Sequence, residues 1–148
     1  QAGRTVAGPV PADDETIACM AGASMLAARL RGVAGVVVDG CVTDIEELRE
    51  LGVPVWARGL SARTTRAGGQ SGSFCRPVDC GGVRVHPGDA VLADENGVLV
   101  MSPDEAWALA RKAIGLQQTE QQTLTRLRAG ESYSDVLETR LVFQEAAA

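Results

Sequence analysis

The chain has 148 residues, enough for one domain of ordinary size, and its 45% hydrophobic and 22% charged residues argue against long disorder or a small disulfide scaffold. Fourteen Lys and Arg against 19 Asp and Glu give a net charge of −5, which repels phosphate backbones, so we expect no nucleic-acid partner. No apolar run approaches the ~20 residues of a membrane span. We therefore expect no membrane association and a place in the cytoplasm.

Short β-branched runs and helical patterns alternate in the first half of the chain. Strands are predicted at 5–7, 16–20, 33–38 and 54–57, and helices at 24–31 and 44–51. The run at 33–38 is so apolar that both of its faces should be covered, as in an α/β sheet. Gly40 predicts a turn directly after this strand.

The second half begins as a β-meander and ends in helices. Turn signals at 81–82, 87–89 and 95–97 separate predicted strands at 83–85, 90–93 and 98–101, with helices predicted from 102, at 117–128 and at 133–141. We expect one domain over residues 1–148, in which 103–148 form a mainly helical extension. The polar loop 61–73 is long enough to suggest a functional role.

An acid and a hydroxyl stand between the 33–38 strand and the following helix. Thr43 and Asp44 fall at the rim of an α/β sheet where ligands usually bind, and Asp44 with Glu47 could hold Mg²⁺. The same spacing also fits an Asp N-cap with a capping-box partner, which the local sequence favours. Both roles can hold at once.

A second junction and a set of arginines are candidates for anion binding. The small residues Ala21, Gly22, Ala23 and Ser24 could leave backbone N–H groups open to a carboxylate, although the local sequence favours a close-packed helix start. Arg58 and Arg63 could grip an anionic substrate in a bidentate fork or belong to a solvated basic surface.

Other catalytic patterns find little support. The single histidine, His86, precedes a Pro-Gly turn and is expected to be exposed, so a hydrolase triad is not indicated. Four cysteines at irregular spacings favour buried, reduced thiols over a disulfide framework or a zinc site.

Five blocks in order resemble the RraA-like family, which includes the regulator of ribonuclease E activity A, class II 4-hydroxy-4-methyl-2-oxoglutarate aldolases and oxaloacetate decarboxylases. The blocks are RGVAGVVVDG at 31–40, DIEEL at 44–48, VPVWARG at 53–59, PVDCGGV at 77–83 and PGD to ADENGV at 87–98. The resemblance runs from about Thr5 to Arg140, and the chain is short at its amino end compared with typical members.

The resemblance implies an α/β architecture, the β/β/α swivelling-domain fold, assembled as a homotrimer or a dimer of trimers with sites at subunit interfaces. In the catalytic members, backbone N–H groups at the position of Ala21–Ser24 bind the substrate carboxylate. An Arg-Asp pair follows the Val-Asp-Gly strand, where the Asp helps to hold a divalent ion (Mg²⁺ or Mn²⁺) and the Arg contacts the 2-oxo acid. The metal and the Arg stabilise an enolate as the C–C bond breaks.

This chain keeps one member of that pair. Asp44 matches the Asp and Glu47 the acidic position after it, but Thr43 stands in place of the Arg and cannot supply its permanent charge. One hypothesis is a metal-dependent lyase on a 2-oxo acid or related anionic metabolite, with Arg58 or Arg63 completing the site. The alternative is a non-catalytic interaction module like the ribonuclease E regulator.

Overall fold

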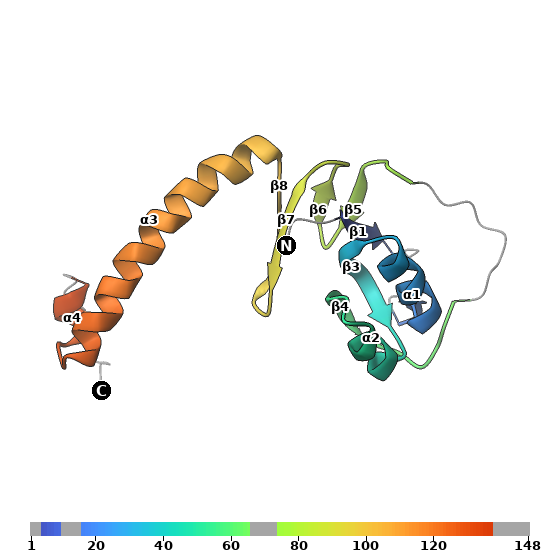
Figure 1. Cartoon of the computed structure of the whole chain (residues 1–148), viewed down its shortest axis with the longest axis horizontal. Coiled ribbons are helices and arrows are strands. Elements are labelled where there is room, and N and C mark those ends of the chain that lie inside the picture. Colours follow the sequence, from blue (N-terminus) through green and yellow to red (C-terminus); the bar gives the residue numbers. More distant parts are fainter. Residues whose placement is uncertain (1–3, 10–15, 66–73, 138–148) are drawn as a thin grey trace, which may run out of the picture. The chain divides into compact units, whose positions relative to one another are not determined.

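The computed structural model describes residues 4–9, 16–65 and 74–137. The chain divides into two compact units, Gln1–Pro103 and Asp104–Ala148, and each is described by itself. The first unit contains the described strands with the helices α1 and α2, and the second contains most of α3 and all of α4 (Figure 1). Helices therefore dominate the region after residue 102, as predicted, while a single domain over 1–148 stays a prediction.

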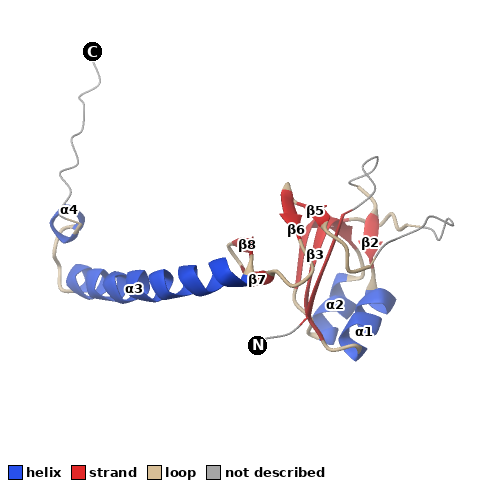
Figure 2. Ribbon diagram, turned by 90° about the horizontal axis from the view of Figure 1, so that it is seen from above, coloured by secondary structure: helices blue, strands red, loops and turns tan. Residues whose placement is uncertain are grey.

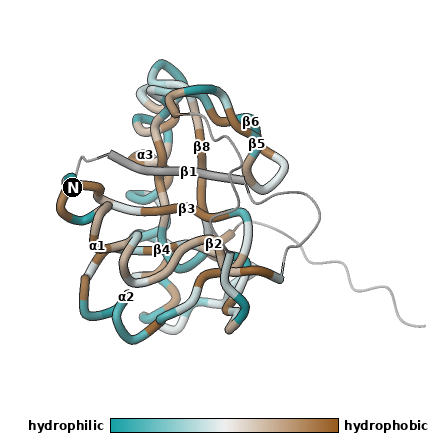
Figure 3. The backbone as a smooth tube through the Cα atoms, turned by 90° about the vertical axis from the view of Figure 1, so that its right-hand side faces the viewer, coloured by the Kyte–Doolittle hydropathy of each residue, from teal (hydrophilic) through white to brown (hydrophobic). Residues whose placement is uncertain are grey.

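Strand β3 (Val33–Val42) is the centre of a parallel sheet. It pairs with β1 (Arg4–Pro9), β2 (Ala18–Met20) and β4 (Val55–Leu60), and every pairing is parallel. Figure 3 shows β3 between its neighbours β1 and β4. Side chains on one face of β3 belong to the buried core and Val37 on the other face lines an apolar cavity, which explains the run of valines.

β3 is longer than predicted, and the turn expected at Gly40 is absent. The strand continues to Val42 because Cys41 pairs with Ala18 of β2 on one side and with Gly59 of β4 on the other. Hydrogen bonds from two neighbouring strands outweigh the low strand propensity of a single glycine. The extension places Asp39 within the strand and Thr43 directly after it.

Two helices cover one face of the sheet. α1 (Gly22–Leu30) and α2 (Ile45–Leu51) lie next to each other against β3 (Figure 2). The even-numbered valines of β3 point to this face, in keeping with the two-residue period of a strand. The buried core that results consists of Met25, Val36, Val38, Val42, Leu48 and Val53.

Two hairpins complete the first unit. β5 (Val78–Cys80) pairs with β6 (Val83–Val85), and β7 (Ala90–Asp94) pairs with β8 (Gly97–Met101), both antiparallel. Gly81 and Gly82 have φ of 59° and 78°, as the two central residues of a type I′ turn require. The strands predicted at 83–85, 90–93 and 98–101 are present, but the predicted meander is wrong, because β6 and β7 do not pair and the strands form two separate hairpins. β5 was not predicted, since Val78 is its only β-branched residue.

The second unit is built on one long helix. α3 (Pro103–Arg128) is continuous, so the prediction of separate helices before and after residue 116 is wrong. The short α4 (Tyr133–Val136) follows, while the predicted continuation beyond 137 lies outside the described residues. Neither α3 nor any other described helix combines the length and hydrophobicity needed to cross a membrane.

Candidate functional site

Asp44 occupies the junction between β3 and α2. Its backbone is left-handed (φ 57°, ψ 47°), a conformation that Asp, Asn and Gly adopt more readily than other residues. Its carbonyl accepts the first helical hydrogen bond from Leu48 N at 3.0 Å, but its side chain makes no cap. The predicted capping box of Asp44 and Glu47 is therefore wrong, because the left-handed backbone turns the carboxylate away from the helix.

The Asp44 carboxylate points instead to the start of α1. The N–H of Gly22 donates to Asp44 Oδ2 at 3.0 Å, and the hydroxyl of Thr43 donates a long bond of 3.4 Å to Oδ1. The backbone N–H of Thr43 in turn donates to the carbonyl of Met20 at 3.0 Å. These bonds join the two strand-to-helix junctions that the sequence picked out separately.

Glu47 reaches the same place from the first turn of α2. A Cβ added to Gly22 would lie 2.7 Å from Glu47 Oε2, so the carboxylate of Glu47 fills the space beside this glycine. Asp44 and Glu47 are both exposed, and both carboxylates therefore meet at the Gly22 backbone near the surface. The absence of a side chain at position 22 is what allows this.

The proposed anion cradle is partly filled by the protein itself. Ala21 N donates to Ser24 Oγ at 3.0 Å, and that hydroxyl donates back to the Ala21 carbonyl at 2.8 Å. The N–H of Gly22 is taken by Asp44. The expectation that Ala21 and Gly22 offer open amides is therefore wrong, whereas Ala23 and Ser24 belong to the first helical turn, whose N–H groups have no acceptor within the helix.

The residues at this junction fit a hard divalent cation. Within residues 4–9, 16–65 and 74–137 no three His, Cys, Asp or Glu side chains gather as a complete metal site. Mg²⁺ commonly takes one or two carboxylates and keeps several waters, and the exposed pair of Asp44 and Glu47 supplies that number of oxygen donors. A pocket of about 240 Å³ borders Asp44 and is also lined by Thr43, Ile45, Leu60, Ser61 and Ala62.

Arg63 lies on a short segment that follows this pocket. Its carbonyl accepts from Ala18 N at 2.7 Å, and its guanidinium donates to Thr16 Oγ1 at 3.2 Å. Ser61 N donates to the Val42 carbonyl at 3.0 Å, so the segment starts at the carboxyl end of β3 and continues to β2. Arg63 is therefore attached to the same sheet edge as Thr43.

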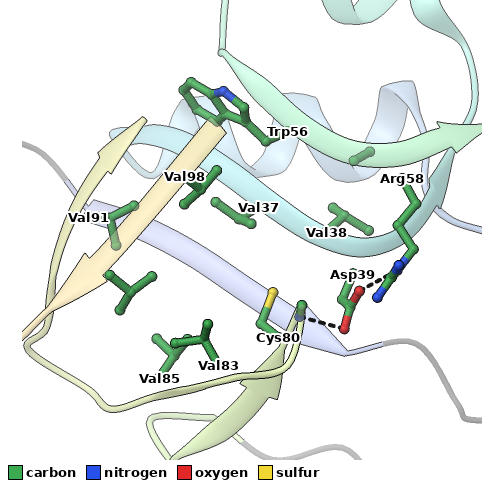
Figure 4. A pocket seen from close by; sticks show the side chains of 13 residues that line it. Val37, Val38, Asp39, Trp56, Arg58, Cys80, Val83, Val85, Val91 and Val98 are labelled. Atoms are coloured by element: carbon green, nitrogen blue, oxygen red, sulfur yellow. Dashed lines mark hydrogen bonds and ion pairs between the residues drawn. The ribbon is translucent and has the colours of Figure 1, made fainter. Parts of the chain in front are cut away.

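Arg58 has a different partner. Its Nε–H donates to Asp39 Oδ1 at 2.5 Å, and Gly81 N donates to Asp39 Oδ2 at 2.7 Å (Figure 4). The Gly81 amide, followed by the Arg58 guanidinium, holds the pKa of Asp39 below its ordinary value. Arg58 is therefore bound to a carboxylate in the middle of β3, and Asp39 was not predicted as its partner.

Asp39 and Arg58 stand at the polar end of an apolar cavity. The cavity has a volume of about 330 Å³ and lies between β3, β4 and the two hairpins (Figure 4). Cys80 borders it, and burial raises the pKa of its thiol. The apolar side chains around it include Val37, Trp56, Val83, Val85, Val91 and Val98.

Other expectations from the sequence have mixed outcomes. His86 is exposed in the turn after β6, as predicted, and its backbone N–H donates to Asp89 Oδ2 at 2.7 Å. All four cysteines are free thiols, but the predicted burial is wrong, because Cys75 is exposed and the other three are only half-buried. Of the polar loop predicted at 61–73, residues 66–73 lie outside the described part of the chain.

Comparison with known proteins gives consistent results. The sequence profile of the RraA-like family, described as Aldolase/RraA, matches residues 9–100. An uncharacterized protein of Methanocaldococcus jannaschii is 34% identical over 116 residues, which cover 78% of this chain and 55% of that protein. A protein of Halalkalibacterium halodurans named "Putative 4-hydroxy-4-methyl-2-oxoglutarate aldolase" is 35% identical over 58% of this chain and 40% of its own length. The chain spans about half the length of these relatives.

Solved structures share the fold. A protein from Pseudomonas syringae superposes with a TM-score of 0.81 over 92% of this chain and 63% of that chain, at 20% identity. Streptomyces coelicolor RraAS2, titled an unusual member of the RNase ES inhibitor RraA protein family, has a TM-score of 0.67 at 31% identity, over 79% of this chain and 60% of its own. With the predicted α/β fold confirmed and the profile matching more than half of its residues, the chain belongs to the RraA-like family.

Proposed function

We propose that this protein is a divalent-metal-dependent carbon–carbon lyase that acts on a 2-oxo acid or a related anionic metabolite. The observation that carries the proposal is the convergence of Asp44 and Glu47 on the Gly22 backbone, where Asp44 Oδ2 lies 3.0 Å from the amide nitrogen. The two exposed carboxylates offer oxygen ligands for Mg²⁺ or Mn²⁺, and the helix start beside them offers backbone N–H groups for an anion. The aldolase names of several relatives support the same reaction class.

Each residue of the site has a distinct part in this proposal. Asp44 and Glu47 would hold the cation, which when bound supplies Lewis-acid stabilisation of negative charge on the 2-oxo group. The first-turn amides of Ala23 and Ser24 would bind the substrate carboxylate, since those of Ala21 and Gly22 already have acceptors. Thr43, through its hydroxyl, orients Asp44 and can donate one hydrogen bond to developing negative charge.

The structure favours Arg63 over Arg58 as the arginine that contacts substrate. Arg58 shares an ion pair with Asp39 at the end of the apolar cavity. Arg63 follows directly on Ser61 and Ala62, which border the pocket of Asp44. Within the proposal, Arg63 therefore binds the anion. Arg58 acts indirectly, because its ion pair with Asp39 holds β4 in position.

The test is the loss of oxaloacetate, with coupled detection of pyruvate, with and without Mg²⁺. Wild type should show weak, metal-dependent turnover, because Thr43 replaces a charged donor by a hydroxyl. Glu46→Gln is the matched control for Glu47→Gln, since Glu46 is an exposed acid on the same helix turn and has no part in the site. Turnover that does not respond to Mg²⁺ or Mn²⁺ would contradict the proposal.

A second candidate is a non-catalytic regulatory module. Thr43 favours it, because the position lacks the charged donor of the catalytic members, and a structural relative at 34% identity is titled the RNA-processing inhibitor RraA from Thermus thermophilis. This candidate would be supported over the lyase if the chain binds a partner protein, keeps that binding in Asp44→Asn, and shows no detectable metal binding.

We also propose a homotrimer, or a dimer of trimers, with the site near a subunit interface. Large apolar side chains stand exposed on the first unit, with Leu60 at 61%, Leu92 at 65% and Leu99 at 60% of full exposure. A closed ring would cover such side chains without leaving unsatisfied edges. Light scattering coupled to gel filtration tests this, and a monomer at micromolar concentration would contradict it.

A further inference from the structure

The Gly22 amide has two potential acceptors. It belongs to the helix start at which the proposed lyase would bind its anion, yet its N–H donates to Asp44 Oδ2 at 3.0 Å. An N–H group makes one good hydrogen bond, so a substrate carboxylate and Asp44 cannot both have it at full strength. Asp44 is also the carboxylate expected to hold the cation.

We propose that Asp44 competes with anionic ligands for the Gly22 amide, and that a divalent cation relieves this competition by drawing the Asp44 carboxylate away. The inference rests on the proposed function for the identity of the cation and the anion. It predicts that cation and anion bind with positive coupling, since each favours the arrangement in which Asp44 has left the amide.

The surroundings of Asp44 allow such a change. The residue is exposed, its side chain makes no helix cap, and its second oxygen has only the long 3.4 Å bond from Thr43. Glu47 fills the space beside Gly22, so the Asp44 carboxylate stands against a second negative charge. A cation between the two carboxylates would remove this repulsion as well.

Two variants separate competition from charge. Asp44→Asn and Asp44→Gly both lose the negative charge, and both residue types tolerate the left-handed backbone at φ 57°. Asn keeps an oxygen that can accept from Gly22, whereas Gly leaves the amide without this acceptor. The difference between the two variants therefore measures the occupation of the amide.

The experiment is calorimetric titration with oxalate in buffer freed of divalent ions. We expect the Asp44→Gly variant to bind oxalate about tenfold or more tightly than Asp44→Asn, which corresponds to one hydrogen bond to a charged group. Glu47→Gln serves as the charge control and should resemble Asp44→Asn. Equal affinities of the two Asp44 variants, or no binding by Asp44→Gly, would overturn the proposal.

A second measurement uses the unaltered protein. In a ¹H–¹⁵N spectrum, adding Mg²⁺ alone should move the Gly22 amide resonance toward its position in Asp44→Gly, and an unmoved resonance in a protein that binds Mg²⁺ would contradict the competition. The lyase assay is independent of both measurements. Metal-dependent turnover together with equal oxalate affinities of the two Asp44 variants would support the lyase and contradict the competition. A difference in oxalate affinity without turnover would support the competition and contradict the lyase.

Discussion

Two aspartates five positions apart, Asp39 within β3 and Asp44 after its end, differ in their partners. Asp39 accepts from Arg58 Nε at 2.5 Å and from Gly81 N at 2.7 Å, and its side chain is 19% exposed. Asp44 accepts from the neutral donors of Gly22 and Thr43 at 3.0 and 3.4 Å and is exposed. Among the described residues, Asp44 is seen with no cationic partner.

This difference separates a structural carboxylate from one that can act on a ligand. The charge of Asp39 is neutralised by Arg58 of β4, and the bond that Asp39 accepts from Gly81 N fastens the β5–β6 turn to the central strand. The Asp44 carboxylate lies beside Glu47, at a helix start that favours anions. A bound cation would neutralise the carboxylate of Asp44, as Arg58 neutralises that of Asp39.

The largest expected effect is that of Asp44→Asn on metal-dependent turnover. We expect activity to fall by about 10²–10³, because a cation ligand and its charge are lost. Stability should change by less than about 1 kcal/mol, since Asn tolerates the left-handed backbone and can still accept from Gly22. Oxaloacetate assays and urea unfolding measure the two effects, and full retention of turnover would leave Asp44 without a catalytic part.

Thr43→Arg should change turnover in the opposite direction. A fixed positive charge next to Asp44 can stabilise an enolate oxygen, and one preorganised donor is commonly worth ~10²–10³ in rate. The gain should stay below this range, because the new charge also repels the cation. Oxaloacetate loss with and without Mg²⁺ is the measurement, and a variant with bound metal but no gain would point to another substrate class or to the regulatory module.

Asp39→Asn should affect stability and leave metal binding intact. An amide group would turn its NH₂ toward either Arg58 or Gly81, so one charge-assisted bond is lost, at a cost of about 2 kcal/mol. The matched control is Asp79→Asn, which breaks the exposed pair of Arg84 and Asp79 on β5 and β6. That variant should lose less than about 1 kcal/mol by urea unfolding, and equal losses would remove the distinction between the two pairs.

The contrast between the two aspartates also shows what could be predicted from the sequence. Periodicity and turn residues were sufficient for the α/β fold and for both strand-to-helix junctions, whereas Asp44 as a site residue stays a prediction. The capping box failed because the carboxylate of Asp44 binds an amide 22 positions away, a contact that no local pattern encodes. Asp39 was missed for the same reason, since its partners Arg58 and Gly81 come from β4 and from a hairpin turn.

The smallest expected effect concerns the pH dependence of stability. The pKa of Asp39 is lowered in the folded protein by the Gly81 amide and by Arg58, so its ionised form stabilises the fold. This contribution is fully present above the unfolded pKa of about 3.9 and is lost as the pH falls through the lower, folded pKa. Wild type should therefore lose stability as the pH drops from about 5 toward that value.

Asp39→Asn lacks this contribution, and its free energy of unfolding should fall less steeply over the same interval. The two proteins should therefore differ most near neutral pH and converge in acid. Asp94 also has a lowered pKa, caused mainly by the backbone N–H of Asn96, so the variant keeps part of the acid sensitivity. Adding Asp94→Asn should flatten the curve further. Urea unfolding at a series of pH values measures this, and a constant difference between wild type and Asp39→Asn from neutral pH to acid would show that the charge of Asp39 does not stabilise the fold.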